Sequence, residues 1–167
     1  AVTQPAPYPQ FNPTGFQKTV NIGVAYTSYL TEITDSDGGT VAVLSSLDTA
    51  ANGDWLVIGY SSTFYGFFLD LDSPNSTASV MTVEYWNGSA WTAMTGTAAV
   101  PHDHTAVDGV TLNRSHMVAW LVPPADWATS TINSIAAYWV RVSFSVALDS
   151  NVMVRECRII GNASNTS

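Results

Sequence analysis

The feature that most constrains the fold is a succession of short apolar segments separated by turn-forming residues. About ten such segments are rich in Val, Thr and aromatic residues and are bounded by Gly, Asn, Asp, Ser or Pro, as β-strands are. Many short strands in one chain favour an all-β fold, an antiparallel β-sandwich or jelly roll. The predicted strands are 19–26, 40–46, 54–62, 64–72, 79–86, 90–96, 106–112, 116–122, 137–148 and 151–160.

Alternation along two of these segments predicts the core. Successive side chains of a strand point to opposite faces, so the more apolar set is expected inside. This rule places Trp139 and Arg141 on one outer face and Phe68 and Asp70 on another. Outward aromatic rings such as Phe68 and Trp139 need cover from the arm described below or from another chain. The predicted core residues of the two segments are Tyr138, Val140, Val142, Phe144, Val146, Tyr65, Phe67, Leu69 and Leu71.

One segment, 123–133, favours a helical turn. Pro124 suits the first turn of a helix, and Asp126 suits its positive end. The β-branched residues that follow end the helix early, so we expect a single turn with Trp127 beneath it.

The length of 167 residues suits a single domain with tails. Residues 1–18 contain four prolines in their first sixteen positions and predict an extended N-terminal arm. We expect a jelly-roll-like β-sandwich over 19–161 and a polar tail over 162–167. An ordered arm must bury Tyr8, Phe11 and Phe16. We expect a neighbouring subunit to cover them, and folding back onto the same domain is the alternative.

The composition of the chain limits the classes of molecule that it is expected to bind. Five basic and thirteen acidic residues give a net charge of −8, which disfavours direct nucleic-acid binding. No apolar run is long enough to span a bilayer, so we expect no membrane partner. The single cysteine, Cys157, excludes an internal disulfide and is expected to be a buried, inert thiol.

No pattern indicates catalysis or a cofactor, and we expect a protein that is not an enzyme. The only candidate metal site is formed by His102, His104 and Asp108, since His-x-His in a strand puts both imidazoles on one face. A polar loop with exposed histidines is the favoured alternative.

The sequence DSDGG at 35–39 resembles the start of a calcium loop but lacks the rest of its ligand pattern, so a tight turn is expected. Asn75-Ser76-Thr77 matches the N-glycosylation pattern, which we discount in a chain rich in Asn, Ser and Thr.

The sequence EYWNGSAW, residues 84–91, predicts a hairpin that can close in two ways. A two-residue Asn87-Gly88 turn pairs Trp86 with Ser89, whereas a four-residue loop pairs Trp86 with Trp91. The alternation rule buries Val83 and Tyr85 and turns Trp86 toward the surface. Trp86, Trp91 and Trp139 therefore form a candidate exposed aromatic surface that could stack on sugar rings.

Three landmarks together resemble a β-rich module of structural proteins from tailed bacteriophages. The first is the Tyr-Trp-Asn-Gly hairpin with Trp91, the second joins Trp120, Pro123, Pro124 and Trp127, and the third is Tyr-Trp-Val-Arg at 138–141. The resemblance covers roughly residues 54–148 and leaves the arm outside.

The resemblance implies a non-enzymatic virion protein. It indicates a capsid decoration, or cement, protein that binds the head surface, or a tail or baseplate accessory module. The implied partners are the major capsid protein and further copies of the chain, as a homo-oligomer for which a trimer is one candidate. The alternative is a carbohydrate-binding module, associated with a tail, that attaches to glycans of the host surface.

Overall fold

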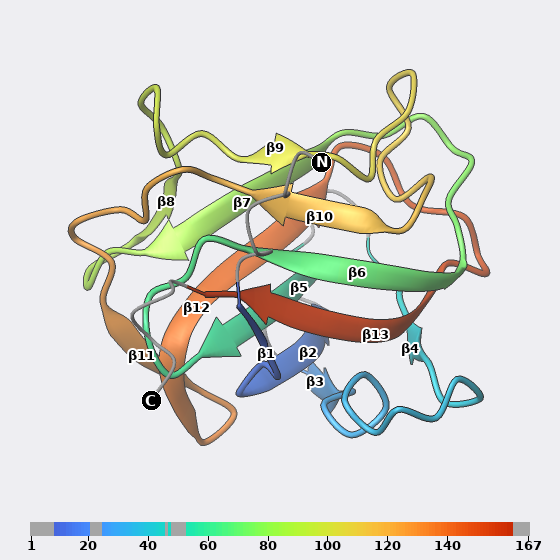
Figure 1. Cartoon of the computed structure of the whole chain (residues 1–167), viewed down its shortest axis with the longest axis horizontal. Helices are drawn as coiled ribbons and strands as arrows, with labels where there is room; N and C mark the ends of the chain where they lie inside the picture. The colour runs from blue at the N-terminus through green and yellow to red at the C-terminus, as the bar shows by residue number, and fades with distance from the viewer. Residues whose placement is uncertain (1–8, 21–24, 46, 48–52, 162–167) are drawn as a thin grey trace, which may run out of the picture.

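The computed structural model describes residues 9–20, 25–45, 47 and 53–161, which form two antiparallel β-sheets packed face to face (Figure 1). All the regular elements of this described part are strands, and the predicted all-β sandwich is confirmed. None of its segments is a helix long and apolar enough to cross a membrane.

The six-stranded sheet has the order β1-β13-β6-β10-β9, with β4 also paired to β13. In Figure 1 its long central strands, β6 and β13, lie across the front of the molecule. Its strands are β1 (Gln10–Phe11), β4 (Ala42–Val43), β6 (Gly66–Ser73), β9 (His102–Asp103), β10 (His116–Ala119) and β13 (Met153–Ile160).

The seven-stranded sheet has the order β3-β2-β5-β12-β7-β8, with β11 also paired to β12. Its strand β12 is the longest of the described strands and pairs with three neighbours. Its strands are β2 (Gly15–Val20), β3 (Ala25–Ser28), β5 (Trp55–Tyr60), β7 (Met81–Trp86), β8 (Trp91–Ala93), β11 (Thr129–Ile132) and β12 (Ile135–Phe144).

The core lies between the two sheets, and alternation predicted most of it. Strand β6 contributes buried Phe67, Leu69 and Leu71, while β12 contributes Val140, Val142 and Phe144. Val146 is an exception at 46% exposure, because β12 ends at Phe144 and the chain turns outward. Cys157 is fully buried in the same core, as expected, and burial raises the pKa of its thiol far above the usual value.

The predicted boundary of the N-terminal arm at residue 18 is wrong. Residues of β1 and β2 belong to the two sheets, and Phe16 is fully buried in the domain core. The segment GFQKTV forms a strand with buried residues on both faces, and the many prolines before it dominate the composition of the N-terminal region. Phe11 packs against the same core and stacks on Tyr60 with ring centroids 5.6 Å apart. Tyr8 and the rest of residues 1–8 lie outside the described residues.

Two further predictions of local structure concern turns: the single turn expected after Pro124 is present, and the strand expected at 106–112 does not form. Residues 123–127 form no helix, only a turn in which Trp127 N–H donates to the Pro124 carbonyl at 3.3 Å. Trp127 is buried, as expected, and the β-branched residues after it enter strand β11. The predicted strand 106–112 is also a turn, closed by mutual hydrogen bonds of 3.0 Å between Val107 and Val110.

Candidate binding surfaces

The outer face of the seven-stranded sheet gathers most of the candidate aromatic residues. Cross-strand register puts Trp139 beside Gly59 and Arg141 beside Val57 and Glu84. Trp55 follows on the same face of β5, and Trp86 pairs with Trp91 at the far edge. Because side chains on one face repeat every second residue, these groups lie on the same face of the sheet.

Trp139 does not belong to an exposed platform, contrary to the prediction. Its side chain is fully buried, because its ring lies over Gly15 and Gly59, which have no side chains to displace it. The indole N–H donates to the Ser130 carbonyl at 2.9 Å. Ile132 and Ile135 of the β11–β12 hairpin pack against the same cluster. Alternation predicted the correct face of the sheet but not the hairpin that covers it.

The hairpin of residues 84–91 closes with the longer loop, so Trp86 pairs directly with Trp91. The Asn87 side-chain oxygen accepts hydrogen bonds of 2.8 Å from the N–H groups of Ser89 and Ala90, which fixes the loop. The two indoles are half-buried and meet edge to face, with centroids 5.6 Å apart. The predicted burial of Val83 and Tyr85 on the opposite face is confirmed.

Arg141 links this indole pair to a third tryptophan. Its guanidinium lies 4.3 Å from the ring centroid of Trp55 and 5.1 Å from that of Trp91. Its Nε donates to Glu84 Oε1 at 2.8 Å, so the positive charge is paired within the surface. Stacking on two rings and a charged hydrogen bond fix the arginine and both rings relative to one another.

Beside Arg141 the sheet surface is hollowed into a groove of about 230 Å³, which we call the aromatic groove. Trp55, Trp86 and Trp91 line it together with Tyr26 of β3 and Thr19 of β2. Thr19 Oγ1 and Trp55 Nε1 are buried polar atoms without a hydrogen-bond partner. The sequence prediction missed Trp55, Tyr26 and Thr19. Applying the alternation rule to 54–62 would have placed Trp55 on the outer face, whereas nothing in the sequence indicated that β3 lies beside it.

A second surface is formed where two loops meet at one end of the sandwich. The N–H groups of Leu121 and Val122 both donate to the Ala98 carbonyl, at 2.9 and 3.0 Å. These bonds present Leu121 with 71% and Val122 with 52% of its surface exposed, and Val100, two residues after Ala98 in the chain, is 41% exposed. We call these three residues the aliphatic patch.

A shallow depression of about 400 Å³ adjoins the aliphatic patch, with Val122 and Tyr85 in its lining. There the Tyr85 hydroxyl donates to Asp126 Oδ1 at 2.7 Å, and this hydrogen bond raises the pKa of Tyr85.

The three histidines gather at strands β9 and β10. The ring centroid of His104 lies 6.3 Å from that of His102 and 5.3 Å from that of His116. The candidate metal site of His102, His104 and Asp108 is not assembled: Asp108 lies in the Val107–Val110 turn, and no group of His, Cys, Asp or Glu within the described ranges is arranged to hold a metal ion. Partial burial, and then the charge of Arg114 and the nearby His104, lower the pKa of His116.

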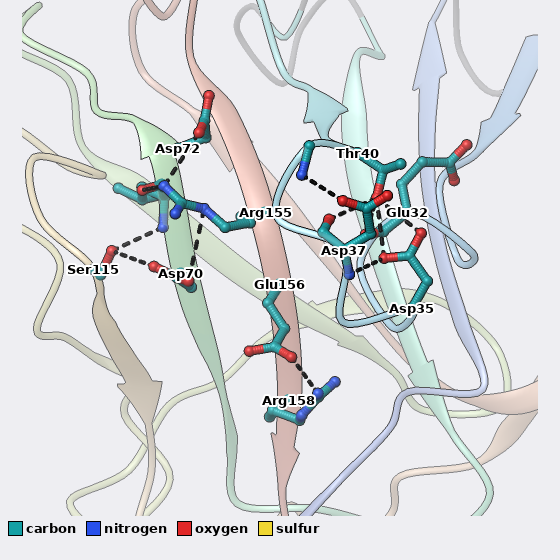
Figure 2. A network of polar contacts seen from close by, with 12 residues as sticks. Glu32, Asp35, Asp37, Thr40, Asp70, Asp72, Ser115, Arg155, Glu156 and Arg158 are labelled. Carbon is teal, nitrogen blue, oxygen red and sulfur yellow. Dashed lines mark hydrogen bonds and ion pairs between the residues drawn. The ribbon is translucent and has the colours of Figure 1, made fainter.

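The loop after β3 and the outer face of β6 and β13 carry a network of charged side chains (Figure 2). Arg155 bridges Asp72 at 3.1 Å and Asp70 at 3.9 Å. The sequence DSDGG forms the expected tight turn, since Asp35 Oδ1 accepts from Asp37 N–H and Asp37 Oδ1 accepts from Gly39 N–H, both at 2.9 Å.

All five basic side chains are engaged within the chain. Lys18 donates to the Val43 carbonyl, Arg114 to the His104 carbonyl and Arg141 to Glu84. Arg155 and Arg158 form ion pairs on β13. The excess acidic groups, among them exposed Asp35 and Asp37, therefore set the sign of the surface potential.

No protein-family model, curated protein or solved structure matches this chain. The surfaces described above are therefore the basis for a functional proposal.

Proposed function

We propose that this chain is a non-enzymatic structural protein of a tailed-phage virion, a decoration protein that binds and stabilises the outer surface of the head. The observation that carries this proposal is the aliphatic patch. Leu121 and Val122 are adjacent, strongly exposed and held by two backbone hydrogen bonds. Exposed apolar groups that are fixed before binding lose little conformational entropy when a partner covers them, which favours a docking surface.

The charge distribution supports the same role. Because Arg141, Arg155 and Arg158 are ion-paired within the chain, its thirteen acidic groups dominate the charge that it presents to its surroundings, in line with the net charge of −8. Such a surface is complementary to a basic or neutral protein shell and is repelled by nucleic acid. Binding to the major capsid protein is then expected to weaken as salt concentration rises.

The position of the N-terminal segment supports a second point at which the protein attaches to its neighbours on the shell. Pro9 accepts a hydrogen bond from Gly161 N–H at 2.9 Å, and Gln10 and Phe11 pair with Ile160 and Ile159 at the edge of the six-stranded sheet. Residues 1–8 continue from this anchored edge strand. We retain the prediction that they contact neighbouring subunits, and the homo-oligomer on the shell is part of the same proposal.

Occupancy on phage heads tests the proposal. Purified protein is mixed with heads that lack it, and the bound fraction is measured after sedimentation. We expect Leu121→Ser and Val122→Ser to reduce occupancy, and removal of residues 2–8 to reduce it independently. Val80→Ser is the matched control, because Val80 is 62% exposed and directly precedes β7, at the end of that strand remote from Tyr85, which lines the depression beside Val122. Failure of the unaltered protein to bind heads would exclude the decoration role.

The alternative role, a carbohydrate-binding module on a tail, is favoured by a different observation, the aromatic groove. This groove is compatible with either position in a virion.

A further inference from the structure

We propose that the aromatic groove is a binding site for a neutral saccharide, with one pyranose ring held between Trp55, Tyr26 and the Trp86–Trp91 pair. The inference rests on the groove alone and does not require that the protein decorate a capsid.

The walls of the groove suit a sugar ring. Trp55, Trp86 and Trp91 are half-buried and Tyr26 is 40% exposed, so each ring packs against the sheet and still has surface open to a ligand. A pyranose has apolar C–H faces that pack on aromatic rings and hydroxyl groups around its edge. Aromatic walls with a few polar atoms are the usual lining of small-molecule sites. The volume of about 230 Å³ suits a single ring rather than a long segment of chain.

The floor of the groove carries polar groups that an apolar ligand would leave unsatisfied. Thr19 is only 1% exposed, and its Oγ1 has no hydrogen-bond partner. Trp55 Nε1 is a second buried donor without a partner. Buried polar groups are nearly always hydrogen-bonded, so two unpartnered atoms beside one groove point to a ligand with hydroxyl groups. Both atoms are shielded from bulk solvent in the free protein, so a ligand reaches them when the exposed ring of Tyr26 shifts aside.

Charge decides the class of saccharide. The only cation at the groove, among the described side chains, is Arg141, and its charge is already paired with Glu84 at 2.8 Å. The chain as a whole carries a net charge of −8. An anionic sugar would meet no free positive group and an unfavourable field, whereas a neutral sugar avoids both costs. The stacked guanidinium also holds Trp55 and Trp91 in place before binding, which reduces the entropy lost with the ligand.

Calorimetry and tryptophan fluorescence on the full chain test the proposal, with cellohexaose, maltohexaose, mannohexaose and xylohexaose as neutral probes and oligogalacturonate as the anionic probe. We expect at least one neutral probe to bind and to quench or shift tryptophan emission, and Trp86→Ala to weaken that binding about tenfold. Phe68→Ala is the matched control, because Phe68 is a half-buried aromatic residue of the other sheet, and it should leave the affinity unchanged.

Thr19→Val separates a binding role from a structural one. Valine has nearly the same shape, so loss of the unpartnered hydroxyl should raise the melting temperature of the free protein while lowering saccharide affinity. The proposal is overturned if no neutral probe binds, if the anionic probe binds more tightly, or if Trp86→Ala and Thr19→Val both leave the affinity unchanged. It is also overturned if the fluorescence change reports self-association of the protein and Trp86→Ala abolishes that self-association. The groove would then be an interface between copies of the chain.

Discussion

Gly59 and Trp139 face each other across strands β5 and β12, and the ring of Trp139 occupies the space that a side chain at Gly59 would need. A Cβ at Gly59 would lie 2.6 Å from Cε3 of the indole, well inside van der Waals contact. The absence of a side chain at this position thus permits the largest fully buried residue of the chain to lie flat on the sheet.

We expect Gly59→Ala to destabilise the fold by about 1–3 kcal/mol, the usual cost of forcing extra atoms into a packed site. The free energy of unfolding from urea denaturation measures this effect. Gly38→Ala is the control, because a Cβ there would meet only Arg155 Cδ at an ordinary 3.5 Å. Equal stability of the two variants would show that the Trp139 ring can move away at little cost.

A second prediction concerns Asn75, which connects three loops at one end of the sandwich. Its Nδ2 donates to the carbonyls of Thr77 and Thr111 at 2.8 and 3.1 Å, and its Oδ1 accepts from the N–H groups of Thr77 and Asp149. The side chain is 1% exposed, so Asn75→Ala would leave several buried groups unpaired. We expect a loss of about 1–3 kcal/mol or more in the free energy of unfolding.

Asn113→Ala provides the comparison for Asn75. It removes a single donation, from Asn113 Nδ2 to the Asn75 carbonyl at 3.1 Å, and should cost less. A larger effect at Asn113 would contradict the central role of Asn75. The same buried geometry agrees with discounting Asn75 as a glycosylation acceptor.

Sequence patterns predicted the features that depend on alternation within one strand. They missed the features that depend on another segment packing over a residue. The inner residues of β6 and β12 and the surface orientation of Trp86 follow from the two-residue period of a strand. Trp139 obeys the same rule, yet it is buried because the β11–β12 hairpin packs over it. That hairpin turns at Asn133 and Ser134, whose φ angles of 48° and 68° suit a tight two-residue turn, but neither residue is the glycine that usually indicates one.

The candidate sites show the same contrast between what local sequence patterns predict and what long-range packing determines. Phe16 was assigned to an arm because prolines dominate the residues before it, and its own segment lacks the apolar alternation that would have indicated a strand. The aromatic groove combines residues of β2, β3, β5, β7, β8 and β11, whose adjacency is set mostly by long-range pairing. Sequence spacing contains no information on such pairing for a chain considered without relatives.

A third prediction concerns pH. The pKa of His116 lies below its ordinary value of 6.5 in the folded state, chiefly because of burial and then because of Arg114 and His104. The unfolded chain therefore binds a proton more readily than the folded one, and stability falls as pH drops through about 6.5 toward the folded pKa. We expect the melting temperature to decrease over this range and the decrease to be smaller in His116→Gln.

One control variant and one other titrating group make the pH prediction specific. His102→Gln, at an exposed ring of the same cluster, should keep the decrease of the parent protein. Asp149 contributes at lower pH, because hydrogen bonds from Ser76 and Thr77 depress the pKa of its carboxyl below 3.8. The stability it confers is present above that value and is lost as pH falls through the folded pKa. An unchanged pH profile in His116→Gln would show that His116 is not the titrating group.

The last prediction concerns Arg141, whose contribution to stability depends on both its rings and its carboxylate. Arg141→Met keeps much of the side-chain volume but leaves Glu84 without its partner and removes the cation between Trp55 and Trp91. We expect a loss of about 2–4 kcal/mol in the free energy of unfolding, because the pair is partly buried. Arg141→Lys keeps the charge without the planar stacking and should cost about 1 kcal/mol. A double-mutant cycle with Glu84→Gln measures the coupling directly, and we expect the double variant to be more stable than the sum of the single effects predicts. Strict additivity would mean that Glu84 and Arg141 stabilise the sheet independently, and that the rings alone hold the arginine in place.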